Sequence, residues 1–539
     1  MMREGIARAT GLSLSEISTT LRFLGRVPAF LRRPFSDAEA RALVRDRLSG
    51  REAAFLALVR RTVYERGDSP YRTLLREAGC ELGDLARLVQ GAGVEGALQE
   101  LLRRGVYLTV SEFKGRVPVR RGGTTFTVDP ARLRNAAIRA QVMSRTSGSR
   151  GARVLVPMDL RTVRERAVYR YLALTAQGGR HWRHAIWAVP GSSPIVAMLQ
   201  FCAGGMRPVR WFSQVDPASA SLPAAYRWSG RALRVAALIA ARRLPGPTYV
   251  APDEPLPIVK WMREVHRGGG VPHIQTFPSS AVRVCQAAAA AGLDIAGSRF
   301  TVLGEPLTPV RLDLIQRTGA AAYPSYSTVE CGPIGGACGA PATADDVHVH
   351  HDRHALVQPG AGMDVGGLPS DGLLVSTVCP ELPLVLLNVS LGDRGVLERR
   401  ACGCPLERLG WTTHLHTIRS FEKLTAGGMT VLDTDVVHVL DELLPRRFGG
   451  GPTSYQLVET TTEGIPSLAL LAHPALGRLD EMAVRDAFLE SIGGLSPAGR
   501  VTALRWRAEG LPRVERRPPL TTVTGKILHV HQGGLTDPQ

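Results

Sequence analysis

The chain has 539 residues, of which 44% are hydrophobic and 21% charged, and its formal net charge is +18. This composition excludes a disordered chain, and the length predicts two or three domains. No apolar run reaches the roughly 18 to 20 residues that span a bilayer. The amino terminus lacks the long apolar centre and cleavage site of a secretory signal, so we expect a cytoplasmic protein.

The basic residues are scattered along the chain, and no helix-turn-helix, zinc-finger or RNA-recognition pattern accompanies them. We therefore expect acidic small substrates or a general background charge, with neither nucleic acid nor a membrane as a partner. Eight cysteines are too few for a disulfide scaffold in a chain of this length.

The elements expected in chain order change character twice. Helical spacing dominates residues 1–115, and a β-hairpin is predicted around Gly122-Gly123. From about 140 to 415, short apolar runs alternate with helical ones, as in an α/β core. After about 420 a smaller strand and helix pattern begins. The predicted strands are 152–157, 183–190, 247–252, 299–304 and 372–380, and the predicted helices are 159–176, 279–293 and a core helix over 233–241.

The stretch "SRTSGSRGARVLVP" (144–157) places hydroxyls and glycines before a predicted strand. Such a loop can turn backbone N–H groups toward a phosphate. It does not fit the G-x-x-x-x-G-K-[ST] pattern of P-loop enzymes. Taken alone, the stretch favours a solvated turn.

Three later stretches carry chemistry. In 300–335 an apolar strand enters Gly304-Glu305-Pro306, a helix follows, and an aromatic-rich loop ends in Glu330; a core strand with a chance tyrosine and glutamate is the alternative. "GDRG" offers Asp393, whose carboxylate presents paired acceptors suited to a cis-diol. "PPLTTVTGKILHV" (518–530) places Lys526 about a hundred residues after "IRSFEKLTAGG".

The order of these motifs over 144–530 resembles the adenylate-forming (acyl-CoA synthetase) superfamily, and within it the phenylacetate–CoA ligase family. The resemblance implies an α/β fold: a large N-terminal domain with mixed β-sheets and helices, and a small mobile α+β C-terminal domain. We expect a helical region over 1–139 packed on the large domain. An α/β core that binds nucleotide and substrate would follow over 140–418, and a small domain carrying the catalytic lysine over 419–539.

The resemblance also implies an activity. ATP and a carboxylic acid would give an acyl-adenylate and pyrophosphate, and the acyl group would pass to a thiol such as that of CoA. The alternatives are an unusual acid such as nitrite, a carrier-protein thiol or an amine as acceptor, and a relative that binds nucleotide without turnover. Whether the chain acts as a homodimer stays open.

The site residues follow from the resemblance position by position. Lys526 would meet the carboxylate and the α-phosphate, and Glu330 would hold Mg²⁺. Asp393 and Arg419 would hold the ribose, while His273 and Phe277 are acyl-pocket candidates that are as readily ordinary core residues. The other residues implied at the nucleotide are Thr146, Ser147, Gly148, Ser149, Arg150 and Gly151 at the phosphates, and Gly304, Glu305, Pro306, Tyr323, Ser325 and Tyr326 around the adenine.

Three positions depart from the family pattern. Val329 stands where a hydroxyl residue is expected to touch phosphate, and Ser327 or Thr328 can substitute for it. Phe421 stands where the hinge aspartate is expected, and Arg150 where a small hydroxyl residue is usual. These departures favour divergence in the substrate or the acceptor.

A metal site is also implied. Some relatives in this family bind a structural zinc through one cysteine after the glutamate loop, one histidine and a later Cys-x-Cys. Three thiolates and an imidazole suit tetrahedral Zn²⁺. The matching residues here are Cys338, His348, Cys402 and Cys404. His350 or His351 as the ligand, or unligated core cysteines, are the alternatives, and Cys331 is interpreted as a packing residue.

Overall fold

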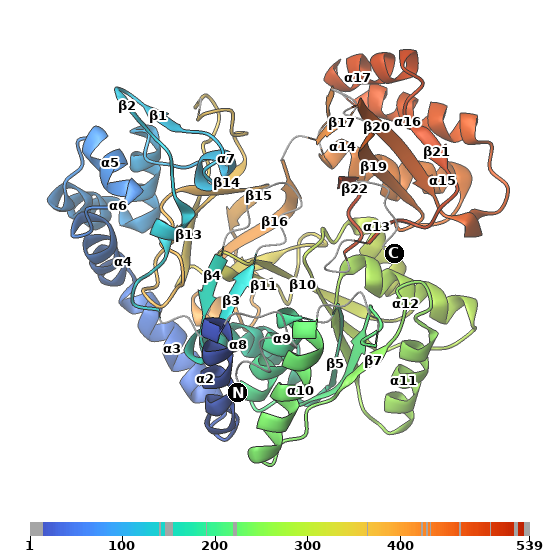
Figure 1. Cartoon of the computed structure of the whole chain (residues 1–539), viewed down its shortest axis with the longest axis horizontal. Coiled ribbons are helices and arrows are strands. Elements are labelled where there is room, and N and C mark those ends of the chain that lie inside the picture. Colours follow the sequence, from blue (N-terminus) through green and yellow to red (C-terminus); the bar gives the residue numbers. More distant parts are fainter. Residues whose placement is uncertain are drawn as a thin grey trace.

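Figure 1 shows the computed structural model, in which a sheet and its helices form the main body and a smaller unit lies at one end. The structure describes residues 14–138, 142–145, 155–189, 191–218, 224–363, 365–421, 424–426, 429–431, 433–462, 465–495, 497–521 and 526–532.

A twelve-stranded mixed sheet organises the main body. Its order is β13-β14-β15-β16-β12-β11-β10-β9-β8-β5-β6-β7, and the half from β7 to β10 is parallel while the rest is antiparallel. The parallel strands are β5 (Arg183–Ala188), β6 (Pro208–Ser213), β7 (Pro247–Tyr249), β8 (Pro272–Thr276), β9 (Arg299–Leu303) and β10 (Ala321–Thr328). The antiparallel strands are β11 (Gly332–Ala337), β12 (Val347–Val349), β13 (His354–Val357), β14 (Gly372–Thr377), β15 (Val389–Arg399) and β16 (Thr413–Ser420). The α/β fold class predicted from the sequence is confirmed.

Helices cover both faces of the parallel half, so its strands are buried on both sides. In β5, Ile186 packs into the core on one face while Ala185 and Trp187 pack into the core on the other, as alternation along a strand requires. The helices of the first face are α8 (Leu160–Ala176), α9 (Ser192–Ala203) and α10 (Ala224–Ile239), and those of the second are α11 (Leu256–Arg267), α12 (Pro278–Ala290) and α13 (Pro309–Gln316).

The N-terminal helices pack on this body rather than apart from it. Two of them share the core under α8 and α9, and the others share a core with the antiparallel strands. They are α2 (Leu14–Leu31), α3 (Asp37–Ser49), α4 (Arg51–Val59), α5 (Pro70–Glu77), α6 (Leu82–Arg103) and α7 (Val110–Phe113). The predicted hairpin is present, with β1 (Val119–Arg121) and β2 (Thr124–Phe126) joined through Gly122-Gly123, where Gly122 has φ of 51°. A positive φ at the turn is why glycine is needed there.

The C-terminal unit, which we call the C-terminal lobe (residues 433–532), has its own core. Its four-stranded sheet runs in the order β21-β20-β19-β22, and Figure 1 shows it above α12 and α13. Its elements are α14 (Asp433–His438), α15 (Leu444–Phe448), β19 (Tyr455–Thr462), β20 (Ile465–Ala472), α16 (Glu481–Leu495), α17 (Pro497–Ala508), β21 (Arg513–Glu515) and β22 (Val530–Gln532). Among the described residues, no helix has both the length and the apolar composition needed to cross a bilayer.

Two sequence predictions are wrong in detail. The stretch 233–241 is not wholly a core helix, because Val235, Leu238 and Ile239 are 62%, 57% and 64% exposed while Leu233 and Ala237 are buried. One stripe of α10 covers the sheet and the other side faces outward. The aromatic-rich segment before Glu330 is strand β10 rather than a loop, since its tyrosines and threonine suit a strand paired on both sides.

Candidate functional site

The site predicted from the sequence lies where the parallel half of the sheet meets the antiparallel half. β9 and β10 end at the same edge, and Glu330 occupies the turn that joins β10 to antiparallel β11. Along the sheet, the chain builds β5, β6 and β7 to one side and β8, β9 and β10 to the other. Open α/β sheets bind ligands at the carboxyl ends of their strands beside such a reversal.

Gly304 ends β9 and has φ of 82°, a conformation that favours glycine. A Cβ at this position would lie 3.0 Å from Lys526 Cε, 3.1 Å from Lys526 Nζ and 3.4 Å from Phe277 Cε1. The lysine of the C-terminal lobe therefore reaches the end of β9, next to a phenylalanine that precedes α12. Only glycine at position 304 leaves room for the Lys526 side chain.

Glu305 holds the lobe at this edge. Its buried carboxylate accepts hydrogen bonds from the Ser279 backbone N–H (3.0 Å), the Ser279 hydroxyl (2.9 Å) and Arg311 Nη1 (3.1 Å). It also accepts the backbone N–H of Ile527 at 2.9 Å, directly beside Lys526. A single carboxylate thus joins the start of α12, the helix α13 and the segment that carries the lysine.

Three carboxylates lie within electrostatic range of Lys526. Burial lowers the pKa of its amine, and the negative charges of Glu305, Asp393 and Glu330 oppose that shift. Burial raises the pKa of Glu330, while the charges of Lys114 and Lys526 oppose it. Opposite charges close together favour the charged forms of both partners. The structure thus places Lys526 and Glu305 at the end of β9. Glu330 and Asp393 lie within electrostatic range of Lys526, and Lys114, which no motif in the sequence singled out, acts on Glu330.

Asp393 lies in β15 and accepts a hydrogen bond from the Tyr326 hydroxyl at 2.8 Å. Burial and the Asp393 charge raise the pKa of Tyr326 well above its ordinary value, so the phenol stays protonated and donates. Arg419 pairs instead with Asp345 at 2.8 Å. Register places Asp393 opposite Ser420 and Arg394 opposite Arg419, which puts the Asp393 and Arg419 side chains on opposite faces of the sheet.

His273 is completely buried in β8. Its Nδ1 lies 2.9 Å from His184 Nδ1, and its Nε2 lies 2.8 Å from Thr301 Oγ1. Burial, then the charges of His184 and Arg170, lower its pKa well below the ordinary value, so the ring is neutral. His273 therefore has partners within the protein, whereas Phe277 lies beside Gly304 and Lys526.

Tyr323 and Ser325 of β10 pair with Thr301 and Leu303 of the parallel strand β9. The Tyr323 ring stacks on Trp182, with centroids 5.9 Å apart. The proposed phosphate residues 146–151 lie outside the described residues. The strands on either side, β3 (Val142–Arg145) and β4 (Leu155–Met158), pair antiparallel.

A second buried network joins the C-terminal lobe to α13. Arg311 Nη1 binds Glu305, and Arg311 Nε lies 3.2 Å from Asp441 Oδ2. His529 Nε2 lies 2.8 Å from both Asp441 Oδ1 and Arg311 Nη2, and Thr308 donates to Asp441 at 3.2 Å. Thr308 also caps α13, whose first residue is proline. The "LTP" of the sequence therefore both starts the helix and reaches the lobe.

Acid should weaken this network. Burial raises the pKa of Asp441, but the charges of Arg311 and His529 outweigh burial and hold it below its ordinary 3.8. A carboxyl with a lowered folded-state pKa stabilises fully above its unfolded pKa, and that stabilisation is lost as pH falls through the folded value. Urea unfolding from pH 7 to pH 3 should show this loss in the wild type. In the Asp441→Asn variant the free energy of unfolding should depend less on pH. The same pH dependence in both proteins would contradict a stabilising role of the Asp441 carboxylate.

The four predicted zinc ligands are also brought together. His348 Nε2 lies 3.1 Å from Cys404 Sγ and 3.5 Å from Cys402 Sγ. Ligand atoms of Cys338, His348, Cys402 and His414 all lie within 4.8 Å of one another. The cluster therefore contains a second histidine, which the sequence prediction missed.

The surroundings of this cluster suit a metal. His348 Nδ1 lies 2.7 Å from the Trp411 carbonyl, so Nδ1 carries the proton and Nε2 offers its lone pair toward the thiols. A hydrogen bond from the Cys338 thiol lowers the pKa of the Cys404 thiol, which favours thiolate. His414 Nδ1 lies 2.8 Å from Asp346, and its buried Nε2 has no hydrogen-bond partner among the described residues.

The two alternative histidines do not join the cluster. The His350 ring packs against Tyr169 and Trp411, with centroids 4.7 and 4.6 Å apart. Neither His350 nor His351 belongs to the group of close ligand atoms within the described residues. Cys331 is buried in the core shared with the N-terminal helices.

No protein-family model matches the chain, and no curated protein matches it. Among solved structures, the chain is similar to 2-hydroxyisobutyryl-CoA ligase in complex with 2-HIB-AMP and CoA (15% identity, 93% of this chain, 91% of that one, TM-score 0.44). A structure of that ligase in the postadenylation state is 17% identical, covers 90% of this chain and 87% of its own, and has a TM-score of 0.47. O-succinylbenzoate coenzyme A synthetase from Bacillus subtilis, in complex with ATP and magnesium, is 12% identical. It covers 73% of this chain and 69% of its own, with a TM-score of 0.42. Identities and scores this low say nothing of the activity, so the chemistry has to follow from this chain's own residues.

Proposed function

We propose that the chain is an AMP-forming ligase of the adenylate-forming superfamily. It would join ATP and a carboxylic acid into an acyl-adenylate and pass the acyl group to a thiol such as that of CoA. One observation carries the proposal: Lys526 of the C-terminal lobe lies against Gly304 at the carboxyl end of β9, within electrostatic range of Glu305, Asp393 and Glu330. The motifs that resemble the superfamily lie far apart in the sequence, and the approach of Lys526 to the end of β9 supports a common site for them.

In the first step a carboxylate oxygen of the acid attacks the α-phosphorus of ATP. The bond from that phosphorus to the oxygen bridging the β-phosphate breaks, and pyrophosphate leaves with the electron pair. Negative charge builds on the α-phosphoryl oxygens and on the leaving pyrophosphate, while the incoming carboxylate loses charge as its bond to phosphorus forms. The Lys526 ammonium would stabilise that charge, and the charges of nearby carboxylates favour its charged form.

Glu330 is the residue that would hold Mg²⁺, and its surroundings fit that role. Burial raises the pKa of its carboxyl, so the carboxylate gains from a nearby cation. Carboxylate oxygens suit Mg²⁺, which when bound neutralises triphosphate charge. Asp393 would accept the ribose hydroxyls, oriented by the Tyr326 hydroxyl that it already binds.

In the second step the acceptor sulfur attacks the carbonyl carbon of the acyl-adenylate. A carbon–sulfur bond forms, AMP leaves with the electrons of the carbon–oxygen bond, and the thiol proton passes to solvent. Phe277, beside Lys526 and Gly304, is the acyl-pocket candidate nearest these groups. His273 already binds His184 and Thr301, so it would act on the substrate only through that neutral hydrogen-bonded pair.

The test is ATP-dependent pyrophosphate release with a panel of aryl, fatty and amino acids and nitrite, with and without CoA. We expect release with at least one acid, and thioester only when CoA is present. Adenylate that accumulates without thioester would point to a carrier-protein or amine acceptor. Nucleotide binding with no release for any acid would contradict the proposal and favour a binding protein.

Replacing Gly304 with alanine should weaken the reaction. The new Cβ would lie about 3 Å from the Lys526 amine, in a conformation with φ of 82°. A left-handed conformation costs a non-glycine residue about 1 to 2 kcal/mol, and Lys526 must also move. The backbone strain lowers stability, whereas displacement of the Lys526 ammonium lowers the rate. We expect a loss of about 1.4 kcal/mol of transition-state stabilisation, so kcat for pyrophosphate release should fall about tenfold. Gly292→Ala, also at positive φ but with open space around it, is the matched control.

We propose in addition that Cys338, Cys402, Cys404 and His348 hold a structural zinc, with His414 beside them. Purified protein should contain about one equivalent of zinc, because a closed set of four ligands binds the metal tightly. Metal analysis should show the zinc lost in Cys402→Ser and retained in Cys202→Ser, a cysteine outside the cluster. A stably folded, metal-free wild type would refute the assignment.

A further inference from the structure

A basic pocket lies at the edge of the sheet opposite the proposed catalytic site. It is formed by residues before or at the start of β5, β6 and β7, and has a volume of about 480 Å³. β5 has six residues, so at about 3.3 Å per residue the two edges are about 20 Å apart. The lining residues are Arg180, His181, Trp182, Arg183, Gly205, Met206, Arg207, Pro208, Val209, Arg243, Leu244 and Pro245.

The charge of this pocket is one-sided. Four arginines line it and no carboxylate does. Within the described part of the chain, no ion pair involves Arg180, Arg183, Arg207 or Arg243. The Arg207 guanidinium donates to the backbone carbonyl of Arg243 at 3.3 Å, which brings these two residues together. Like charges that share one pocket without counter-charges attract an anion.

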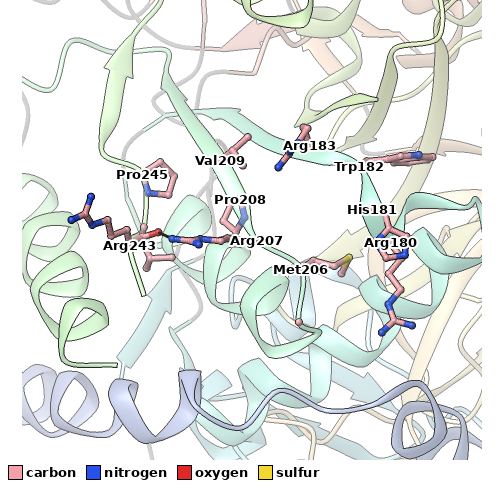
Figure 2. A pocket seen from close by; sticks show the side chains of 12 residues that line it. Arg180, His181, Trp182, Arg183, Met206, Arg207, Pro208, Val209, Arg243 and Pro245 are labelled. Atoms are coloured by element: carbon pink, nitrogen blue, oxygen red, sulfur yellow. Dashed lines mark hydrogen bonds between the residues drawn. The ribbon is translucent and has the colours of Figure 1, made fainter. Parts of the chain in front are cut away.

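The arrangement selects for more than one anionic group. Figure 2 shows Arg207 and Arg243 toward one end of the pocket, Arg180 and His181 toward the other, and Arg183 between them. Met206 is buried in the floor. A volume of this size suits a small ligand rather than a nucleic acid strand. Guanidinium groups bind phosphate oxygens through paired N–H donors, which makes arginine the preferred residue for such ligands.

We propose that this pocket binds the diphosphate group of a small molecule. The group is either free inorganic pyrophosphate or part of a nucleoside diphosphate. This site is separate from Lys526 and does not depend on the proposed reaction. The four arginines are scattered from residue 180 to 243 in the sequence, and the fold gathers them. Part of the net positive charge of the chain is thus concentrated in this pocket.

The test is calorimetric titration of the full chain with inorganic pyrophosphate and, separately, with ADP. The variants are Arg207→Gln/Arg243→Gln and, as a matched control, Arg210→Gln, an exposed arginine of β6 that does not line the pocket. Each protein is also titrated in the Lys526→Ala background, to separate binding at the catalytic edge. Because the replaced side chains are exposed, the variants should keep their fold, which a melting curve checks.

We expect at least tenfold weaker binding in the double variant, unchanged binding in Arg210→Gln, and weaker binding as salt rises. Pocket binding should survive Lys526→Ala. Pyrophosphate binding would identify the free anion as sufficient, and ADP binding alone would identify a nucleotide. No binding of either probe by the wild type, or equal binding by the double variant, would overturn the proposal and leave a solvated basic surface.

Discussion

Replacing Lys526 with alanine should lower the rate of pyrophosphate release about a hundred- to a thousandfold, the range found when one preorganised donor to a developing charge is lost. The lysine lies against Gly304, and the charges of Glu305, Asp393 and Glu330 act on its amine. No other lysine from the described chain reaches the end of β9 in this way. The measurement is single-turnover release of pyrophosphate at saturating ATP and acid.

Lys260→Ala is the matched control, because Lys260 is an exposed lysine of α11. It should leave release unchanged. Release in the wild type should also fall as pH rises through the lowered pKa of Lys526, since only the charged ammonium stabilises the phosphoryl oxygens. Release undiminished in Lys526→Ala would remove the lysine from the mechanism.

Local patterns predicted the α/β body well, because hydrophobic periodicity is a local signal. The stretches 183–190 and 159–176 are β5 and α8, within a residue or two at each end. The stretch 233–241 shows the limit of such patterns. An apolar run indicates burial only if something covers every side of it, and the sequence does not record that one side of α10 faces outward.

The sequence predicted only those site residues that belong to recognisable motifs. Gly304, Glu330, Asp393 and Lys526 were identified by their order along the chain. The structure places Lys526 beside Gly304, and the roles of all four stay predictions. The role of Glu305 as the group that binds Ile527 and Arg311 was not predicted. Asp441 and His529 were also missed. Asp441 carries no motif, and His529 lies in the stretch 518–530 at a position to which the resemblance gives no role. Both meet Arg311 across more than a hundred residues. Contacts between distant segments leave no local signal in a single sequence.

The buried network between α13 and the C-terminal lobe has a direct energetic consequence. Arg311, Glu305 and Asp441 are each 1% exposed, so two carboxylates share one guanidinium in a site without solvent. Neutralising that guanidinium leaves only the charge of Lys526 to offset the burial of Glu305, and only that of His529 to offset the burial of Asp441. Breaking a buried ion pair on one side is far more costly than replacing the whole pair.

Arg311→Met should therefore destabilise the chain by about 3 to 5 kcal/mol, the range found for removing one partner of a buried pair. Methionine matches much of the arginine stem, so the effect reports charge rather than a cavity. The measurement is the free energy of unfolding in urea, followed by a probe in the C-terminal lobe such as Trp506, which is fully buried there. Arg317→Met is the control, because Arg317 ends the same helix but pairs with Asp313 in solvent.

A second replacement separates charge from packing. Adding Asp441→Asn to Arg311→Met removes one of the two stranded carboxylates, so the double variant should recover part of the lost stability. A simple packing defect would give two losses that add. If Arg311→Met unfolds within about 0.5 kcal/mol of the wild type, as surface substitutions do, the network does not hold the lobe. Lys526 would then reach Gly304 by other contacts, with the Ile527 N–H bond to Glu305 as the remaining tie between the lobe and the end of β9.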